Sequence, residues 1–289
     1  MTDAQIHDLD IRCRHAVEEM LAGEYLSVFK GRGIEFEDVR PYEPGDDVRS
    51  IDWNVTARAG KPFVKRFIEE RDLTVYLIVD VSASSRFGSR ADDKLAAAAG
   101  ICGLLAHAAI RNHDRAGLIL FTDEVECHLP PAKGLNQVAR ILDLIQNHPV
   151  AGRGTDLRQP LDFLMHVTRR RGVVFLISDF QATGYEEALE SAALSHDLIA
   201  VRLHDPRESS LPADGGICRV RDNETGRIVW LDSGDGKSRR EYAERAADRD
   251  ARVREGLQAC GAEVFEVVCG EDYVVDLRAF LQARLDHRR

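Results

Sequence analysis

The sequence predicts an α/β fold in which a doubly wound, mostly parallel sheet is covered by helices on both faces. Three observations predict this fold. From residue 73 onward, short runs rich in Val, Ile and Leu alternate with longer helical patterns. The short runs are apolar throughout, which is typical of strands buried on both sides. Two of them stop in an aspartate, at Asp80 and Asp179. Ligands bind such sheets at the carboxyl ends of the strands, near the point where the strand order reverses.

The elements follow from the local patterns. Apolar residues at helical spacing before Gly23 predict a helix over 3–22, and a loop-rich segment is predicted over about 24–72. The remaining predicted strands are 73–80, 116–122, 125–129, 173–179, 197–203 and 262–268, and the predicted helices are 91–112, 135–147, 157–170, 185–195, 237–259 and 273–286. Segments 217–222 and 227–232 predict a hairpin inserted near 205–236. We therefore expect an N-terminal part, residues 1–72, and a sheet domain, residues 73–289.

Composition excludes some classes of function. The net charge is 39 − 49 = −10, which argues against a nucleic-acid partner because phosphate contacts need a basic surface. The six cysteines form no C-x-x-C pair and no signal peptide precedes them, which predicts reduced thiols in the cytoplasm. The apolar stretch 95–110 contains His107 and is shorter than the roughly 18 residues of a membrane span. We expect a core helix there and no integral membrane segment.

Oxygen-bearing side chains collect at the predicted strand ends. The DVSAS segment carries Asp80, Ser82 and Ser84, which point the same way if the segment is extended. In GRGTDL two glycines frame Thr155, and Asp179 ends a later strand. Oxygen ligands without nitrogen or sulfur suit a hard cation, so the set predicts a magnesium site, or a site for another divalent cation such as manganese.

The charge of this set indicates what the site would do. Two aspartates balance a divalent ion and the hydroxyls add no charge, so the ion keeps affinity for one more anionic oxygen. A glutamate or aspartate of another protein can supply that oxygen. The alternative is that these oxygens only cap turns and helix ends. Turn-forming or capping roles are expected for the neighbouring Ser85, Asp123 and Asp156.

The ordered motifs DVSAS, GRGT and ISD resemble the metal-ion-dependent adhesion site of the von Willebrand factor A domain. The resemblance covers about 200 residues. It implies that Asp80, Ser82, Ser84, Thr155 and Asp179 coordinate the ion directly or through water.

The segment before the sheet is similar to the signature of a bacterial family named domain of unknown function 58. The matching features are Glu35-Phe36, Val39-Arg40-x-Tyr42, Gly45-Asp46, Arg49, Ile51-Asp52-Trp53 and Ala57. Members of that family carry a von Willebrand A-like domain and are commonly linked with MoxR-type AAA+ ATPases, which are thought to assist protein maturation or assembly. The resemblance implies a non-enzymatic protein-interaction module whose partner is such an ATPase or its client, bound through an acidic side chain.

Within the signature segment, Asp46 is expected to cap a helix that runs to about Trp53. Arg40 and Arg49 are placed to pair with the aspartates between positions 46 and 52. Trp53 and Phe63 either anchor the segment on the sheet domain or face a partner. We expect the anchoring role, because large aromatic side chains are more often buried than displayed.

The competing function is a magnesium-dependent phosphoryl-transfer enzyme that uses Asp80 as the nucleophile. Aspartyl-phosphate enzymes of the haloacid-dehalogenase type need D-x-D-x-[TV], and here Ser82 stands at the position of the second acid. The sequence has no G-x-x-x-x-G-K-[ST], H-E-x-x-H or G-x-S-x-G motif. A third interpretation is an inert scaffold with a vestigial site.

Overall fold

The structure is a computed structural model that describes residues 3–21, 34–69, 73–89, 93–152, 154–212, 216–221 and 228–287. It divides into two compact units. The first, called the sheet unit here, comprises Met1–Val28 and Thr74–Arg289. The second, called the hairpin unit, comprises Phe29–Leu73.

A six-stranded sheet with the order β10-β7-β6-β3-β4-β5 forms the centre of the sheet unit. The bounds are β3 Thr74–Asp80, β4 Arg115–Phe121, β5 Val125–Ala132, β6 Val173–Ser178, β7 Asp197–His204 and β10 Glu263–Val268. Neighbouring strands are parallel except β4 and β5, which pair antiparallel. The chain runs outward from β3 through β4 and β5 and returns on the other side of β3 at β6. The strand order therefore reverses between β3 and β6, and the predicted doubly wound α/β fold is confirmed.

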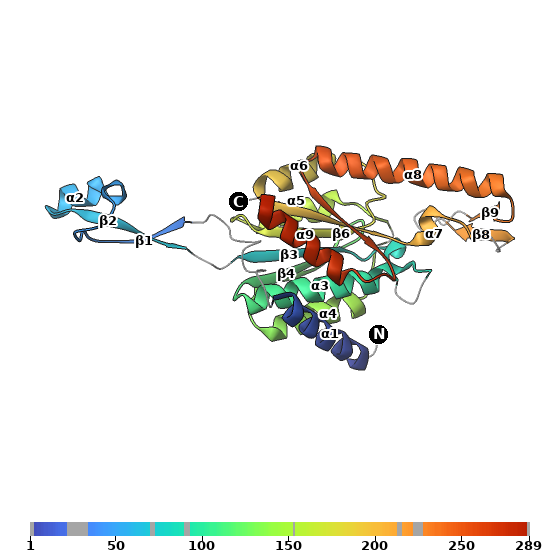
Figure 1. The fold of residues 1–289 in the computed structure, drawn as a ribbon, viewed down its shortest axis with the longest axis horizontal. Coiled ribbons are helices and arrows are strands. Elements are labelled where there is room, and N and C mark those ends of the chain that lie inside the picture. The colour runs from blue at the N-terminus through green and yellow to red at the C-terminus, as the bar shows by residue number, and fades with distance from the viewer. Residues whose placement is uncertain are drawn as a thin grey trace. The chain divides into compact units, whose positions relative to one another are not determined.

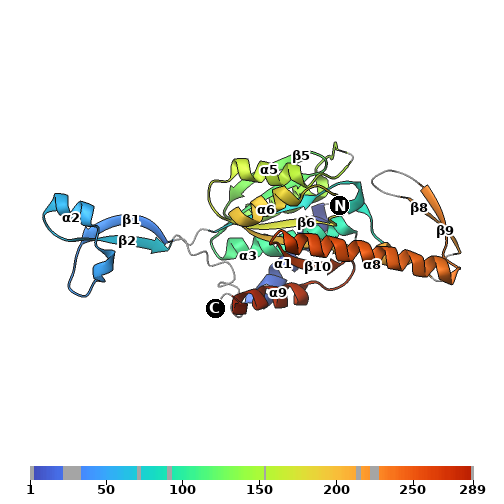
Figure 2. The same cartoon turned by 90° about the horizontal axis from the view of Figure 1, so that it is seen from above.

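Helices cover both faces of this sheet (Figure 1). Their bounds are α1 Asp3–Leu21, α3 Lys94–Arg111, α4 Leu135–Asn147, α5 Arg158–Val167, α6 Glu186–Ser195, α7 Pro206–Ser209, α8 Gly236–Ala259 and α9 Val274–His287. Figure 2 shows α1, α3 and α9 on one face and α5 and α6 on the other. Successive residues of β3, such as Leu77 and Ile78, are both fully buried, because each face of the strand meets a helical layer.

Most of the predicted elements match the structure to within a few residues. Helix α4 has the predicted bounds, and the inserted hairpin is formed by β8 (Ile217–Arg221) and β9 (Ile228–Asp232). Helix α3 begins at Lys94 rather than 91, because the Asp93 carboxylate accepts a hydrogen bond from Ala96 N and caps the helix there. The short helix α7 was not predicted.

Helix α1 belongs to the sheet unit, whereas residues 1–72 were expected to form one N-terminal part. The division between Leu73 and Thr74 lies next to the predicted boundary. The buried α1 residues Leu9, Cys13 and Val17 pack toward the sheet unit, and Cys13 Sγ donates a hydrogen bond to Gly100 O of α3 at 3.5 Å. Asp10 Oδ1 also lies 2.8 Å from His107 Nε2 of α3. The apolar stripe that predicted this helix is therefore the stripe that docks it on α3.

The hairpin unit contains regular structure where a loop-rich segment was predicted. Strands β1 (Ile34–Pro41) and β2 (Phe63–Glu69) pair antiparallel and flank a 3₁₀ turn, η2 (Val48–Ser50), and a short helix, α2 (Trp53–Ala59). The register shifts between Phe36 and Asp38. That shift breaks the alternation of apolar and polar residues by which a strand is recognised.

One prediction for the hairpin unit is corrected by its contacts. Asp46 caps no helix; its carboxylate binds the Arg40 guanidinium through two hydrogen bonds of 2.8 and 2.6 Å, which confirms that pairing. Asp47 caps η2 and Asp52 caps α2. Within the hairpin unit, Trp53 is 68% exposed.

Helix α3 is the helix, among the described residues, whose length and hydropathy would suit a membrane span. However, 83% of that 18-residue window is buried inside the protein. Helix α3 thus lies in the structure as the core helix that the sequence predicted.

Candidate metal centre

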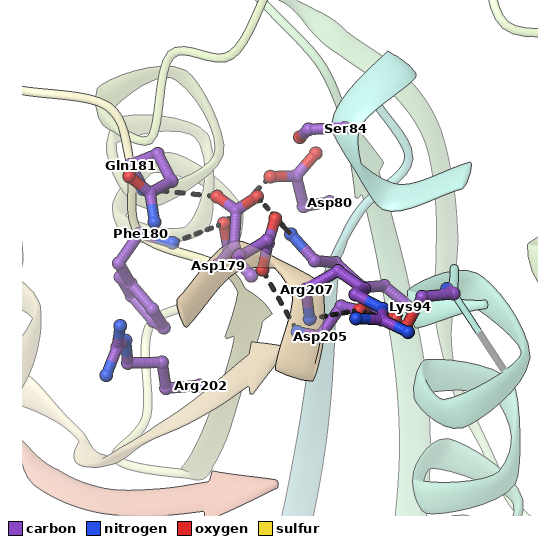
Figure 3. A network of polar contacts seen from close by, with 12 residues as sticks. Asp80, Ser84, Lys94, Asp179, Phe180, Gln181, Arg202, Asp205 and Arg207 are labelled. Carbon is purple, nitrogen blue, oxygen red and sulfur yellow. Dashed lines mark hydrogen bonds and ion pairs between the residues drawn. The ribbon is translucent and has the colours of Figure 1, made fainter. Parts of the chain in front are cut away.

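The candidate centre lies where the strand order reverses, at the carboxyl ends of β3 and β6. Asp80 is the last residue of β3, and Asp179 directly follows β6. The two strands are parallel neighbours, so both acids reach the same edge of the sheet. Ser178 Oγ donates a 2.7 Å hydrogen bond to Asp80 Oδ2. Figure 3 shows the Asp80 and Asp179 carboxylates close together, with Ser84 beside Asp80.

The DVSAS segment is a turn rather than the extended segment that the spacing suggested. Asp80 Oδ1 accepts a hydrogen bond from Ser82 N at 2.9 Å, and Ser82 precedes a 3₁₀ turn, η3 (Ala83–Arg86). Ser82 Oγ and Ser84 Oγ lie 3.0 Å apart, and both side chains are buried. The turn therefore gathers three oxygen-bearing side chains, although by a different backbone path from the one predicted.

Asp179 is presented by an unusual backbone conformation. The next residue, Phe180, is fully buried and has a φ of 56°, in the left-handed region that non-glycine residues seldom adopt. Phe180 N donates to Ser178 Oγ, and Asp179 Oδ1 accepts from Gln181 N at 3.1 Å. The chain turns sharply here, so the Asp179 side chain faces β3.

Thr155 lies on a loop that is attached to the end of β4, the strand next to β3. Asp156 N donates to Thr122 O just after β4, at 2.9 Å. The Glu126 carboxylate accepts hydrogen bonds from Gly152 N at 2.7 Å and from the Thr122 hydroxyl at 2.8 Å. The structure thus gathers Asp80, Ser82, Ser84 and Asp179 into one cluster and places the Thr155 loop at the same edge, beside the next strand.

The residues expected to shape turns do so where their contacts are described. Asp156 Oδ1 accepts from Arg158 N just before α5, which is a turn-forming contact, because the N-cap residue of α5 is Leu157. Ser85 N donates to Ser82 O within η3. Asp123 lies in the connection between β4 and β5.

The electrostatics of the cluster favour a bound cation. Burial and the nearby negative charge of Asp179 raise the pKa of Asp80 from 3.8 to about 6, against the hydrogen bonds from Ser82 and Ser178 that lower it. An ionised Asp80 is therefore unfavourable in this environment unless a positive charge is added. The donors are carboxylate and hydroxyl oxygens, and the described residues contain no group of three or more His, Cys, Asp or Glu side chains placed to hold a metal ion. This chemistry fits magnesium or manganese rather than zinc.

Lys94 is a member of the site that sequence reasoning missed. It is the first residue of α3, and only 1% of its side chain is exposed. Its Nζ donates to Asp179 Oδ2 at 2.8 Å and to Glu208 Oε1 at 2.5 Å. Burial alone would lower the pKa of Lys94, but the two carboxylates outweigh burial and raise it, so the side chain stays an ammonium ion. In the sequence, Lys94 shows only as a single lysine at the start of an alanine-rich helix. Its partner Asp179 is 85 residues away, so no local pattern joins the two residues.

Glu208 is held in place by the first turn of α7. Its Oε2 accepts from Asp205 N at 3.0 Å, while the Asp205 carboxylate accepts from Arg207 N at 2.8 Å, which forms a capping box. Ser89, in the segment after η3, donates to Asp205 through its backbone N and its hydroxyl, at 2.7 and 2.5 Å. The segment that carries the DVSAS turn and the segment after β7 are therefore joined beside the candidate centre.

Comparisons with known proteins find relatives over nearly the whole chain. A family model described as "Protein of unknown function DUF58" matches residues 38–252. Uncharacterized proteins of Mycobacterium bovis and Mycobacterium tuberculosis are each 31% identical over 284 residues, which is 97% of this chain and 89% of each relative.

Solved structures with some similarity include the conserved hypothetical protein BatB from Bacteroides thetaiotaomicron. It has 16% identity and a TM-score of 0.48, and the match covers 74% of this chain and 99% of that chain. The SpRpn10 VWA domain is another, with 12% identity, a TM-score of 0.37 and coverage of 71% and 93%. At these TM-scores the fold assignment rests on the strand order described above.

Proposed function

This chain belongs to the DUF58 family, and from that membership and the oxygen cluster at the ends of β3 and β6 we propose that it is a non-enzymatic, metal-dependent protein-interaction module. The observation that carries the proposal is the buried pair of carboxylates. Asp80 and Asp179 lie close enough for their charges to interact, with two serine hydroxyls beside Asp80. A hard divalent cation is the ligand that relieves this repulsion and that these oxygens suit.

In this proposal Asp80, Ser82 and Ser84 hold the ion from the turn after β3, and Asp179 and Thr155 complete the set from the neighbouring strand ends. When bound, the ion supplies a coordination position for an anionic oxygen of another molecule. Ser178 orients the Asp80 carboxylate, and Gln181 N orients that of Asp179. None of these residues is assigned a proton-transfer or nucleophilic role.

The proposed ligand is a glutamate or aspartate of a protein partner. The family resemblance favours a MoxR-type AAA+ ATPase, or a client of that ATPase, in protein maturation or complex assembly in the cytoplasm. Phosphoryl transfer through Asp80 would need a second acid two residues on, and Ser82 stands at that position.

The first experiment measures metal binding by the purified full chain. If the dissociation constant is roughly 0.1–1 mM, then 1 mM Mg²⁺ stabilises the fold by about 0.4–1.4 kcal/mol. The melting temperature then rises by about 1–6 °C, at roughly 2–4 °C per kcal/mol. Asp80→Asn removes the ligand charge with little change of shape and is expected to abolish the rise. Asp162→Asn, the same change at an exposed aspartate of α5, is expected to preserve it.

The second experiment tests the interaction. Wild type and the two variants are used to capture a purified MoxR-type ATPase with Mg²⁺ or with EDTA. The proposal expects capture that needs Mg²⁺ and is lost in Asp80→Asn alone. An Mg²⁺-induced melting shift that persists in Asp80→Asn would show that the ion binds elsewhere. Hydrolysis of p-nitrophenyl phosphate that disappears with Asp80→Asn would favour the enzyme instead.

A further inference from the structure

Lys94 brings a permanent positive charge to the carboxylates of the candidate metal centre. Its side chain is 1% exposed and that of Asp179 is 4% exposed, so solvent screens their 2.8 Å ion pair little. Charged side chains are rarely buried to this extent unless they are paired. The lysine is therefore part of the charge balance of the centre, as well as being the first residue of α3.

Asp179 has limited capacity to serve a second cation. Its Oδ2 accepts from Lys94 Nζ and its Oδ1 accepts from Gln181 N. A divalent ion drawn to Asp179 would lie beside the Lys94 ammonium, and like charges at such a distance repel strongly away from bulk water. The ion and the ammonium cannot both have full access to this carboxylate.

We propose that Lys94 is a built-in competitor of the metal ion for Asp179 and thereby sets the affinity of the centre. This inference rests on the proposed metal-dependent function and adds a regulating residue to it. Without metal, the ammonium neutralises Asp179. When metal binds, the ammonium moves its interaction toward Glu208.

Glu208 makes that exchange possible because it keeps a carboxylate available to the displaced ammonium. Its Oε1 already accepts from Lys94 at 2.5 Å, and the α7 capping box fixes its other oxygen. The ammonium is thus never left buried without a partner, which would be very costly. Helix α8 also contacts this turn, since Arg249 donates to Glu208 O and Tyr242 donates to Arg207 O. A change in the Lys94–Glu208 pair therefore acts on the α7–α8 region.

The test is isothermal titration of the purified full chain with MnCl₂ and with MgCl₂ at pH 7.5. The variants are Lys94→Gln, Glu208→Gln and the double variant, which replaces the ion pair by two amides. Lys94→Gln removes the competitor and is expected to bind Mn²⁺ at least about tenfold more tightly than wild type. Glu208→Gln leaves the ammonium to Asp179 alone and is expected to bind several-fold more weakly. The double variant should lie between Lys94→Gln and wild type.

Lys237→Gln is the matched control, because it makes the same change of charge at a lysine of α8 that is 74% exposed. Its Mn²⁺ affinity should equal that of wild type. If Lys94→Gln alone does not fold, the double variant still decides the question, because its affinity must exceed that of wild type. If Lys94 has only a structural role, all three variants should bind more weakly than wild type, and that result would overturn the inference.

The failure of this inference differs from the failure of the proposed function. Metal binding by wild type that Lys94→Gln and the double variant leave unchanged or weaken contradicts the competition and leaves the metal site in place. An absence of binding in every variant contradicts the metal site and the competition together. Binding that arises only when Lys94 is replaced supports Lys94 as the competing cation and contradicts metal dependence in wild type.

Discussion

Replacing Asp80 by asparagine is expected to stabilise the metal-free protein at neutral pH. Burial and the charge of Asp179 raise the pKa of this carboxyl from 3.8 to about 6, so its ionised form is less stable in the folded protein than in the unfolded chain. Asparagine has nearly the same shape and carries no charge. It can still accept the hydrogen bond that Ser82 N donates to Asp80.

The magnitude follows from the shift of the pKa. A rise of the Asp80 pKa from 3.8 to about 6 corresponds to about 3 kcal/mol of lost stability once Asp80 is ionised. The charge-assisted bond from Ser178 is weakened in the variant, which offsets about 1 kcal/mol of the gain. We expect a net gain of about 1–3 kcal/mol, or roughly 2–12 °C in melting temperature.

The sign of the pH dependence is fixed by the direction of the shift. The folded wild type holds the Asp80 proton more tightly than the unfolded chain, so its stability falls as the pH rises from about 4 to about 6. The variant has no such proton. Its advantage is therefore fully present above pH 6 and shrinks toward zero as the pH falls to 4.

The assay is urea denaturation of both proteins in EDTA, at pH 7.5 and at several values down to 4. Asp162→Asn, the same change at an exposed aspartate, is the control. An Asp80→Asn protein that is no more stable than wild type at pH 7.5 would refute the reasoning. So would an advantage that does not depend on pH.

Three other substitutions test the remaining structural statements. Glu126→Gln removes the charged acceptor of Gly152 N, so it should lower the unfolding free energy in urea by about 1–3 kcal/mol and reduce the Mg²⁺-induced melting shift. The same change at the exposed Glu124 should alter neither quantity. In α3, Gly103→Ala places a Cβ 2.7 Å from Cys13 Sγ of α1 and should lower the unfolding free energy by about 1–3 kcal/mol. In α8, a Cβ at Gly256 would have no atom within 4 Å, so Gly256→Ala should raise the unfolding free energy by about 0.5–1 kcal/mol. Trp53→Ala should change the unfolding free energy by less than about 0.5 kcal/mol, because that side chain is exposed, and a larger loss would contradict its exposure.

The sheet unit could be predicted because its central strands, β3, β4, β6 and β7, are buried on both faces. In β3 and β6 burial requires apolar residues at successive positions. This pattern can be recognised in the sequence without knowing which strands and helices pack against each strand. The aspartates at the strand ends could be placed together for the same reason, since parallel neighbours share one edge. The Asp80 and Asp179 carboxylates thus lie close together because β3 and β6 are parallel neighbours.

The hairpin unit could not be predicted in this way. The register shift in β1 disrupts the period of two, and adjacent charged residues occur in both strands, at 37–38 and at 65–66. The strands also flank a turn with Pro44 and Gly45. Asp52 caps α2, which starts at Trp53, and Trp53 is exposed within the hairpin unit. The role of Lys94 could not be predicted, because the lysine meets Asp179 only in the folded structure.

A structural role alone does not account for a carboxylate at position 80. The backbone N–H of Ser82 and the hydroxyls of Ser82 and Ser178 bond to it, and each of these groups can also bond to a neutral amide. The negative charge adds repulsion with Asp179, and Lys94 compensates that acid rather than Asp80. If these oxygens only capped turns, the charge of Asp80 would be a cost of about 3 kcal/mol without a return. A divalent cation converts the same charge into binding free energy, and the Mg²⁺-induced melting shift of wild type, compared with that of Asp80→Asn, measures this conversion.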